Sequence, residues 1–182
     1  MSSLVAFLRE AAPGVGAVLA VFLVLTVVSG VWPPMVAVES GSMDPNLREG
    51  DLVFVTGVDD PGQVTTHRAP DAPRRFGRPG DVVVFDPPNR HGSPIVHRAM
   101  FRVEEGENWY DRANESALGS ADDCAELTYC PAQNAGYVTK GDHNDVYDQA
   151  VGRSPPVRTE WVRAEAAARI PWLGRVRLAL AG

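Results

Sequence analysis

Lysine is almost absent from this chain, and the shortage limits the catalytic bases that are available. The sequence has 17 basic residues among 182, and Lys140 is the only lysine. Carboxylates number 23, so the formal net charge is −6 at pH 7 and the isoelectric point is about 5.2. A nucleic-acid partner requires a basic face that neutralises phosphates, and the sequence contains no such cluster. We therefore expect no nucleic-acid partner.

Charged residues are also missing over the long stretch from Ala11 to Val38. Its most apolar part, Val15 to Trp32, is long enough as a helix to cross roughly 27 Å of the ~30 Å hydrocarbon layer. A cleaved secretory signal is the alternative, but its apolar part is usually about 7 to 15 residues long and follows a basic head. We expect a short cytoplasmic N-terminus over 1–14, a transmembrane helix over 15–34 that ends at two consecutive prolines, and an extracytoplasmic domain over 35–182.

The domain after the apolar stretch is predicted to be mainly β, because short apolar runs alternate with Gly, Pro and Asp. The expected strands are Leu52 to Thr56, Asp81 to Phe85, Ile95 to Val103, Tyr137 to Lys140 and Trp161 to Ile170. The last run is rich in alanine and could form a helix by propensity, but the flanking prolines favour a strand.

Two excursions from this core are expected, at 59–79 and 104–135. The first is rich in Pro, Arg and polar residues, and the second carries eight carboxylates between Glu104 and Glu126. Such compositions favour solvated surface loops. The chain has only two cysteines, Cys124 and Cys130, and both lie in the second excursion. Outside the cytoplasm they could close a small loop as a disulfide, and two reduced thiols fit the sequence equally well.

Ser42 is a candidate nucleophile, because it follows the apolar stretch by ten residues and would lie close to the membrane surface. A serine hydroxyl needs a neighbouring base to remove its proton. The strand that contains His97 alternates so that this histidine shares a face with apolar residues, while Arg98 and Arg102 occupy the other face. A lone histidine in such a strand is more often a core residue than a base.

A second region of interest is the acidic turn from Lys140 to Asp148, which follows an apolar strand. This turn could orient an imidazole, or its Asp and Asn side chains could cap their own backbone. A third interpretation is a metal site built from Asp142, His143, Asp145 and Asp148. An EF-hand loop does not fit, because Val146 occupies a position that requires an oxygen ligand. We expect neither a metal nor a cofactor.

Five short segments follow the expected membrane anchor, and their order along the chain resembles that in the type I signal peptidases, in particular the archaeal and endoplasmic-reticulum branch. The matching segments are Ser40 to Met43, Gly80 to Phe85, Ile95 to Arg98, Lys140 to Asn144 with Asp148, and Ile170 to Gly174. The set is specific as an ensemble, although the first segment alone is a weak signal. The resemblance implies a serine endopeptidase with a mainly β fold that removes signal peptides from exported preproteins and cuts after small residues.

The resemblance also implies roles for individual residues. Ser42 is the nucleophile, His97 is the general base where the bacterial branch has a lysine, and Asp148 orients the imidazole. Asp142 matches another important acid of the family, whose role lies between that of a hydrogen-bonding partner and that of a structural brace. The composition agrees with a histidine base, because Lys140 lies inside the acidic turn.

The resemblance places the substrate in an extended form against a strand edge, where Val36 and Val38 are candidate pocket walls. The oxyanion hole would come from the Ser42 N–H group and Ser40. His143 stands where the family commonly has asparagine, which leaves its contact with the site open. The expected partners are signal-peptide-bearing preproteins and the lipid bilayer, with the protein-export channel as a further candidate. The expected location is the cell membrane, with a single span.

Two alternatives remain from the sequence. A membrane-anchored β domain that binds a partner without catalysis would have the same span and strands. A self-processing or single-substrate relative would share the site and differ in the substrates that reach it.

Overall fold

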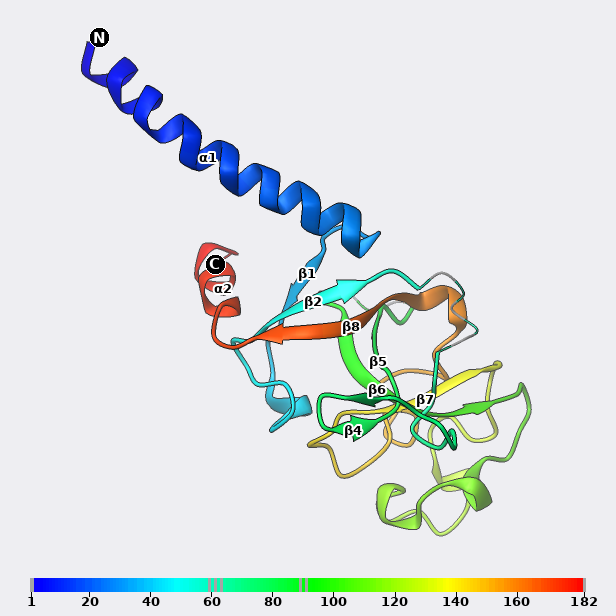
Figure 1. Cartoon of the computed structure of the whole chain (residues 1–182). Helices are drawn as coiled ribbons and strands as arrows, with labels where there is room; N and C mark the ends of the chain where they lie inside the picture. The colour runs from blue at the N-terminus through cyan, green and yellow to red at the C-terminus, as the bar shows by residue number, and fades with distance from the viewer. Residues whose placement is uncertain are drawn as a thin grey trace.

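The chain folds as one long N-terminal helix that leads into a mainly β domain, as the sequence predicts (Figure 1). The computed structural model describes residues 2–58, 60, 62, 64–88, 90 and 92–181. Helix α1 projects away from the β domain. Its segment Arg9–Ser29 has a mean hydropathy of 2.4 and is long and apolar enough to cross a membrane.

Helix α1 (Ser2–Ser29) differs from the expected span at both ends. It begins well before residue 15, because the preceding segment is rich in Leu, Ala, Arg and Glu, which are good helix formers. It ends before the two prolines, because Gly30 adopts a left-handed conformation with φ of +70° and donates its N–H to the Thr26 carbonyl at 3.0 Å. Glycine is the residue that most readily ends a helix in this way.

Six antiparallel strands form one sheet in the order β1-β2-β8-β5-β6-β7. The strands are β1 (Met35–Ala37), β2 (Leu52–Thr56), β5 (Val82–Phe85), β6 (Ile95–Val103), β7 (Gly136–Lys140) and β8 (Val162–Ile170). The five predicted strands are confirmed to within one residue at each end, and the alanine-rich run is a strand. A short hairpin of β3 (Arg74–Arg75) and β4 (Arg78–Pro79) occupies the first excursion, and helix α2 (Gly174–Ala181) follows β8.

Strand β5 lies between two hydrophobic clusters, which explains its unbroken apolar sequence. All four of its residues are buried, with Val82 and Val84 on one face and Val83 and Phe85 on the other. A strand that is covered on both faces reads as a continuous apolar run. The neighbouring strand β6 carries His97, which pairs in register with Val83. The candidate base therefore lies on a strand whose neighbour is completely buried.

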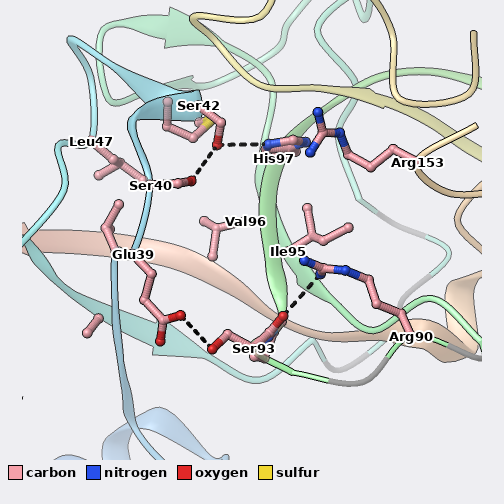
Figure 2. Close-up of a pocket in the computed structure, with 14 residues that line it drawn as sticks. Glu39, Ser40, Ser42, Leu47, Arg90, Ser93, Ile95, Val96, His97 and Arg153 are labelled. Carbon is pink, nitrogen blue, oxygen red and sulfur yellow. Dashed lines mark hydrogen bonds between the residues drawn. The ribbon is translucent and has the colours of Figure 1, made fainter. Parts of the chain in front are cut away.

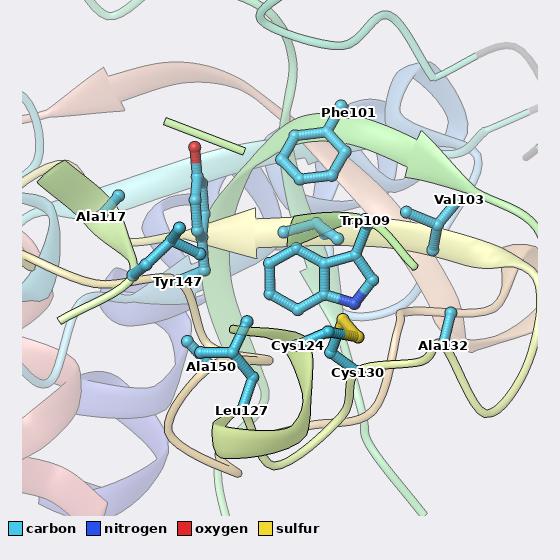
Figure 3. Close-up of a cluster of buried hydrophobic side chains, with 12 residues drawn as sticks. Phe101, Val103, Trp109, Ala117, Cys124, Leu127, Cys130, Ala132, Tyr147 and Ala150 are labelled. Atoms are coloured by element: carbon cyan, nitrogen blue, oxygen red, sulfur yellow. A yellow bond between two sulfur atoms is a disulfide. The ribbon is translucent and has the colours of Figure 1, made fainter. Parts of the chain in front are cut away.

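The second excursion is not a solvated loop, which corrects the expectation from composition. Its carboxylates are mostly exposed, but single apolar side chains between them turn inward and form a third cluster. The cluster is built around Trp109, which packs against Phe101 of β6 and against Tyr147 (Figure 3). Cys124 and Cys130 form a disulfide beside this indole. We refer to residues 104–135 as the accessory lobe.

The accessory lobe holds the segment that follows the acidic turn. The backbone N–H of Tyr147 donates to the Ala117 carbonyl at 3.0 Å, and Tyr129 N–H donates to the Gln149 carbonyl at 3.2 Å. The Thr128 N–H donates to the Ala150 carbonyl at 3.3 Å. Residues 147–150 are therefore fixed to the lobe by main-chain bonds, and Asp148 lies within this segment.

Replacing both cysteines with alanine is expected to lower the free energy of unfolding by about 2 kcal/mol, because the bridge closes a loop with a separation of only six residues. Chemical unfolding of the full chain in detergent measures this loss, and hydrogen exchange should show faster exchange within the accessory lobe. Reductant should produce the same change in the unmodified protein and none in the double variant. Equal stability of the two proteins under oxidising conditions would contradict the prediction.

Candidate active site

Ser42 lies in a single turn of 3-10 helix (Gly41–Met43) that follows β1. The side chain of Met43 anchors this turn. It is only 1% exposed and packs in a hydrophobic cluster with residues of β2, β5 and β8. Ser42 itself remains half-buried, and its hydroxyl faces a cleft (Figure 2). The local fold therefore buries one residue of the turn and presents its neighbour to solvent.

The structure brings Ser42, His97 and Asp148 into one line. Ser42 Oγ lies 3.0 Å from His97 Nε2, and His97 Nδ1 lies 2.6 Å from Asp148 Oδ2. An ionised carboxylate can only accept a hydrogen bond, so Nδ1 carries the proton and Nε2 accepts from the serine hydroxyl. His97 and Asp148 are 2% and 1% exposed, so water is largely excluded from the bond between them.

Two further polar side chains hold Asp148 in this orientation. Thr139, on strand β7, donates its hydroxyl to Asp148 Oδ2 at 2.8 Å. The Thr139 N–H in turn donates to the side-chain oxygen of Gln149 at 2.8 Å. The second carboxylate oxygen of Asp148 lies 3.2 Å from Nε of Arg153. Oδ2 therefore accepts hydrogen bonds, whereas Oδ1 is in ion-pair contact with Arg153 and has no hydrogen-bond partner among the described residues.

Asp142 takes part in a different interaction from the one that contains Asp148. Its two carboxylate oxygens accept from Arg98, Nε to Oδ1 at 2.8 Å and Nη2 to Oδ2 at 2.7 Å. Asn46 donates to Oδ2 at 2.7 Å. Burial by itself raises the pKa of the Asp142 carboxyl, but the hydrogen bonds and positive charge of Arg98 outweigh it, and the pKa is lowered. In this structure Asp142 braces the turn.

Arg98 is completely buried, which corrects the expectation that it lies on a polar face of β6. Its side chain is 1% exposed. Besides Asp142, the guanidinium donates to the Gly80 carbonyl at 2.6 Å and to the Arg75 carbonyl at 3.1 Å. These carbonyls belong to the β3–β4 hairpin and to the residue that directly follows it, so the end of the first excursion covers Arg98 of β6. A buried arginine needs this many partners, because its five N–H donors cannot reach water.

The acidic turn also binds and packs against the backbone of Ser42. The His143 N–H donates to the Ser42 carbonyl at 2.9 Å. Gly141 approaches so closely that an added Cβ would lie 2.5 Å from the same carbonyl oxygen. The side chain of His143 is exposed and lies beside Ser42 at the rim of the site. Any residue larger than glycine at position 141 would therefore displace Ser42.

Lys140 points into the turn itself. Its amine donates to the carbonyls of Gly141 and Asn144 at 3.1 and 2.5 Å. Burial lowers the pKa of Lys140, and the nearby charge of Arg78 lowers it further. The Lys140 amine donates to backbone carbonyls and so stabilises the turn. The hydroxyl of Ser42 contacts His97, not this lysine.

The cleft runs from Ser42 along the end of β1 and the start of β6 (Figure 2). Val38 lines it, whereas Val36 lines an adjoining apolar hollow with Val31 and Trp32. Ser40 reaches the nucleophile directly, with 3.3 Å between the two hydroxyl oxygens. Of the remaining histidines, His67 bonds to the Pro79 carbonyl, and His91 lies outside the described residues.

Sequence reasoning missed three contributors to this site: Thr139, Arg153 and the buried state of Arg98. Thr139 and Arg153 act through Asp148, and neither belongs to a recognisable motif. Arg98 directly follows His97 in the segment Ile95–Arg98, so its position next to the candidate base was the one available signal.

The chain is similar to a protein family and to individual proteins that are described as signal peptidases. The sequence profile of the family described as "Signal peptidase, peptidase S26" matches residues 12–100. The signal peptidase complex catalytic subunit SEC11 of Paracoccidioides brasiliensis is 30% identical over 161 residues, which cover 86% of this chain and 71% of that protein. The corresponding subunit of Aspergillus oryzae is 30% identical over 161 residues, covering 86% and 70%. Human SEC11C is 28% identical over 157 residues, covering 85% and 60%.

Replacing Asp142 with asparagine is expected to lower the free energy of unfolding at neutral pH by roughly 3 to 5 kcal/mol, because Arg98 would remain buried without a counter-charge. The pKa of Asp142 is lowered in the folded chain, so its contribution is present above the unfolded value near 4 and is lost as the pH falls through the folded value. Denaturant titrations at several pH values should show the two proteins converging in strong acid.

Asp145→Asn is the matched control for this variant, because Asp145 lies in the same turn with an exposed side chain. Its stability should stay within about 0.5 kcal/mol of the unmodified chain. A loss for Asp142→Asn that is no larger than this would show that the pair does not brace the turn.

Gly141→Ala is expected to reduce both stability and the reactivity of Ser42, because the new methyl group overlaps the Ser42 carbonyl. Such overpacking typically costs about 1 to 3 kcal/mol. Gly41→Ala is the control for stability, since a Cβ at that position meets no atom within 4 Å. Thermal unfolding and labelling by a serine-reactive phosphonate measure the two effects. Equal melting of the two variants would contradict the close approach.

Proposed function

Since the chain belongs to the signal peptidase family, peptidase S26, we propose that Ser42, His97 and Asp148 are its catalytic triad. The protein is a membrane-anchored serine endopeptidase that removes signal peptides from preproteins. One observation supports the assignment of residues above the others: the hydroxyl, the imidazole and the carboxylate are connected by hydrogen bonds of 3.0 and 2.6 Å.

The triad acts by moving one proton back and forth. His97 Nε2 takes the proton from Ser42 Oγ as the oxygen bonds to the scissile carbonyl carbon. The resulting imidazolium is stabilised by Asp148, and it returns the proton to the amine of the departing mature protein. Water then attacks the acyl group on Ser42 while His97 accepts a proton from it. The bond from the acyl carbon to Ser42 Oγ breaks, His97 returns the proton to Oγ, and the signal peptide leaves with a new carboxylate.

The negative charge on the tetrahedral intermediate requires donors near Ser42. We assign this role to the Ser42 N–H and to the hydroxyl of Ser40, which lies 3.3 Å from Ser42 Oγ. The turn that carries both residues is held by Met43 below and by the acidic turn at the side. A rigid turn keeps its donors aimed at the developing charge without reorganisation during the reaction.

The substrate would lie extended along β1, which is an edge strand of the sheet. An edge strand offers unpaired backbone groups to an extended peptide, and alternate side chains of the peptide then enter the cleft. Val38 closes part of this cleft, and Ile95 and Val96 line the opposite side. These branched residues leave room for small side chains, which supports cleavage after small residues. Val36 would contact the peptide farther from the cut, through the adjoining hollow.

We place the catalytic domain on the extracytoplasmic side of the cell membrane, with the N-terminal segment 1–14 on the cytoplasmic side. Signal-peptide-bearing preproteins reach that side through an export channel, which we propose as a partner together with the lipid bilayer. A signal peptide has its own apolar helix in the bilayer, so an enzyme anchored beside it meets the cleavage site without extracting the substrate. The anchored domain that binds without catalysis is the competing function.

Replacing Ser42 with alanine is expected to reduce cleavage of a secretory precursor by roughly 10⁴-fold or more, because the nucleophile is removed. The measurement compares membranes that contain each form of the full chain, with the product identified by its N-terminal sequence. Ser120→Ala is the control, since Ser120 is exposed in the accessory lobe, and it should cleave normally. Equal cleavage by the Ser42→Ala membranes would shift the function to a binding domain without catalysis.

A further inference from the structure

Arg153 is a charged residue of the cleft to which the mechanism above assigns no role. Its Nε lies 3.2 Å from Asp148 Oδ1, the carboxylate oxygen that His97 does not use. Its backbone N–H also donates to the Asp148 carbonyl, at 2.9 Å. Figure 2 shows the Arg153 guanidinium beside the His97 ring, on the side away from Ser42. The arginine is thus attached to Asp148 through both its main chain and its side chain.

The chain reaches this position by a tight turn over residues 149–152. Gly152 has φ of +75°, and a Cβ there would lie 3.0 Å from the Thr128 side chain of the accessory lobe. Positive φ is readily available to glycine, so this residue lets the chain reverse against the lobe. The reversal returns Arg153 to the carboxylate five residues before it.

The other charged groups near His97 and Asp148 either have partners of their own or are exposed to solvent. Lys140 donates to backbone carbonyls, and Asp142 is neutralised by Arg98. At the far end of the cleft, the carboxylate of Glu39 accepts from Ser93, whose carbonyl accepts from Arg90. His143 and Asp145 of the acidic turn are exposed. Among the described residues, Arg153 is the one arginine or lysine paired with Asp148.

We propose that Arg153 is a positioning residue of the triad, which fixes the free oxygen of Asp148 and offsets part of its negative charge. The inference rests on the proposed function. A carboxylate with full charge stabilises an imidazolium strongly, and a cation on its far side weakens that stabilisation. Arg153 therefore weakens the attraction between Asp148 and an imidazolium at His97, and removing the charge of Arg153 would strengthen that attraction. Fixing the carboxylate also keeps the imidazole in line with Ser42.

The test measures kcat and KM against pH for the full chain in nanodiscs, with one fluorogenic peptide that carries small residues before the cut. The variants are Arg153→Gln, which removes the charge, and Arg153→Lys, which keeps it. For Arg153→Gln the acid limb of kcat/KM should move to higher pH by about half a unit to one unit. We expect kcat at neutral pH to fall several-fold and KM to stay within twofold. Arg153→Lys should restore most of the shift in the acid limb.

Arg158→Gln is the matched control, because Arg158 is exposed to the same degree, 47% against 48%, and pairs with Glu160 away from the cleft. Its pH profile should coincide with that of the unmodified enzyme. A purely structural role of Arg153 would lower stability without moving the acid limb. An unchanged limb, or a rise in KM alone, would overturn the inference.

A second measurement does not depend on turnover. Histidine-selective 13C labelling reports the protonation of the four imidazoles by NMR, and a His97→Gln spectrum assigns the resonance of His97. The His97 titration should move to higher pH in Arg153→Gln and return in Arg153→Lys. An enzyme without cleavage activity that still shows this shift would refute the proposed function and leave the positioning role intact. A titration that does not move would overturn the positioning role.

Discussion

The buried ion pair between Arg98 and Asp142 is the interaction on which the geometry of the site depends. It connects strand β6, the β3–β4 hairpin and the acidic turn, which are far apart in the sequence. The same turn holds the Ser42 carbonyl through the His143 N–H. Because His97 directly precedes Arg98 on β6, the ion pair fixes Ser42 and His97 relative to one another. Desolvating two charges is costly, and the bidentate geometry offsets that cost.

Asp148 is held from the opposite side, by the accessory lobe. Tyr147 packs edge-on against Trp109, and residues 147–150 bond to the lobe through their main chain. The acid of the proposed triad therefore depends on a cluster built by an excursion from the sheet, whereas Ser42 and His97 depend on the sheet core. The alignment of the three groups therefore depends on two separate clusters, and the acidic segment contributes a buried tryptophan and a disulfide to one of them.

The strands could be predicted from the sequence, because β-branched runs between turn residues carry a strong local signal. The burial of Arg98 could not be predicted, because an alternating strand pattern places arginine on the solvent-facing side. Its partner, Asp142, lies 44 residues later in the chain. The packed core of the accessory lobe could not be predicted from composition. Its eight carboxylates dominate the composition, and the apolar residues that pack together occur singly between them. Strand β1 has only three residues, too few for a pattern. The candidate triad could be predicted because several motifs occur in the same order as in a known family. Arg153 and Thr139 contact Asp148 and belong to no motif that could have indicated them.

The position of the site follows from the short connection between the membrane helix and the nucleophile. Only 12 residues separate Ser29, where α1 ends, from Ser42, and they include β1 at the sheet edge. Ser29 is tied to β2 by its hydroxyl, which donates to the Val55 carbonyl at 2.6 Å. The helix therefore leaves the sheet beside the strand that would bind the substrate. In the proposed arrangement a signal peptide would also leave its helix in an extended form, so enzyme and substrate would meet at the same depth without either being withdrawn from the bilayer.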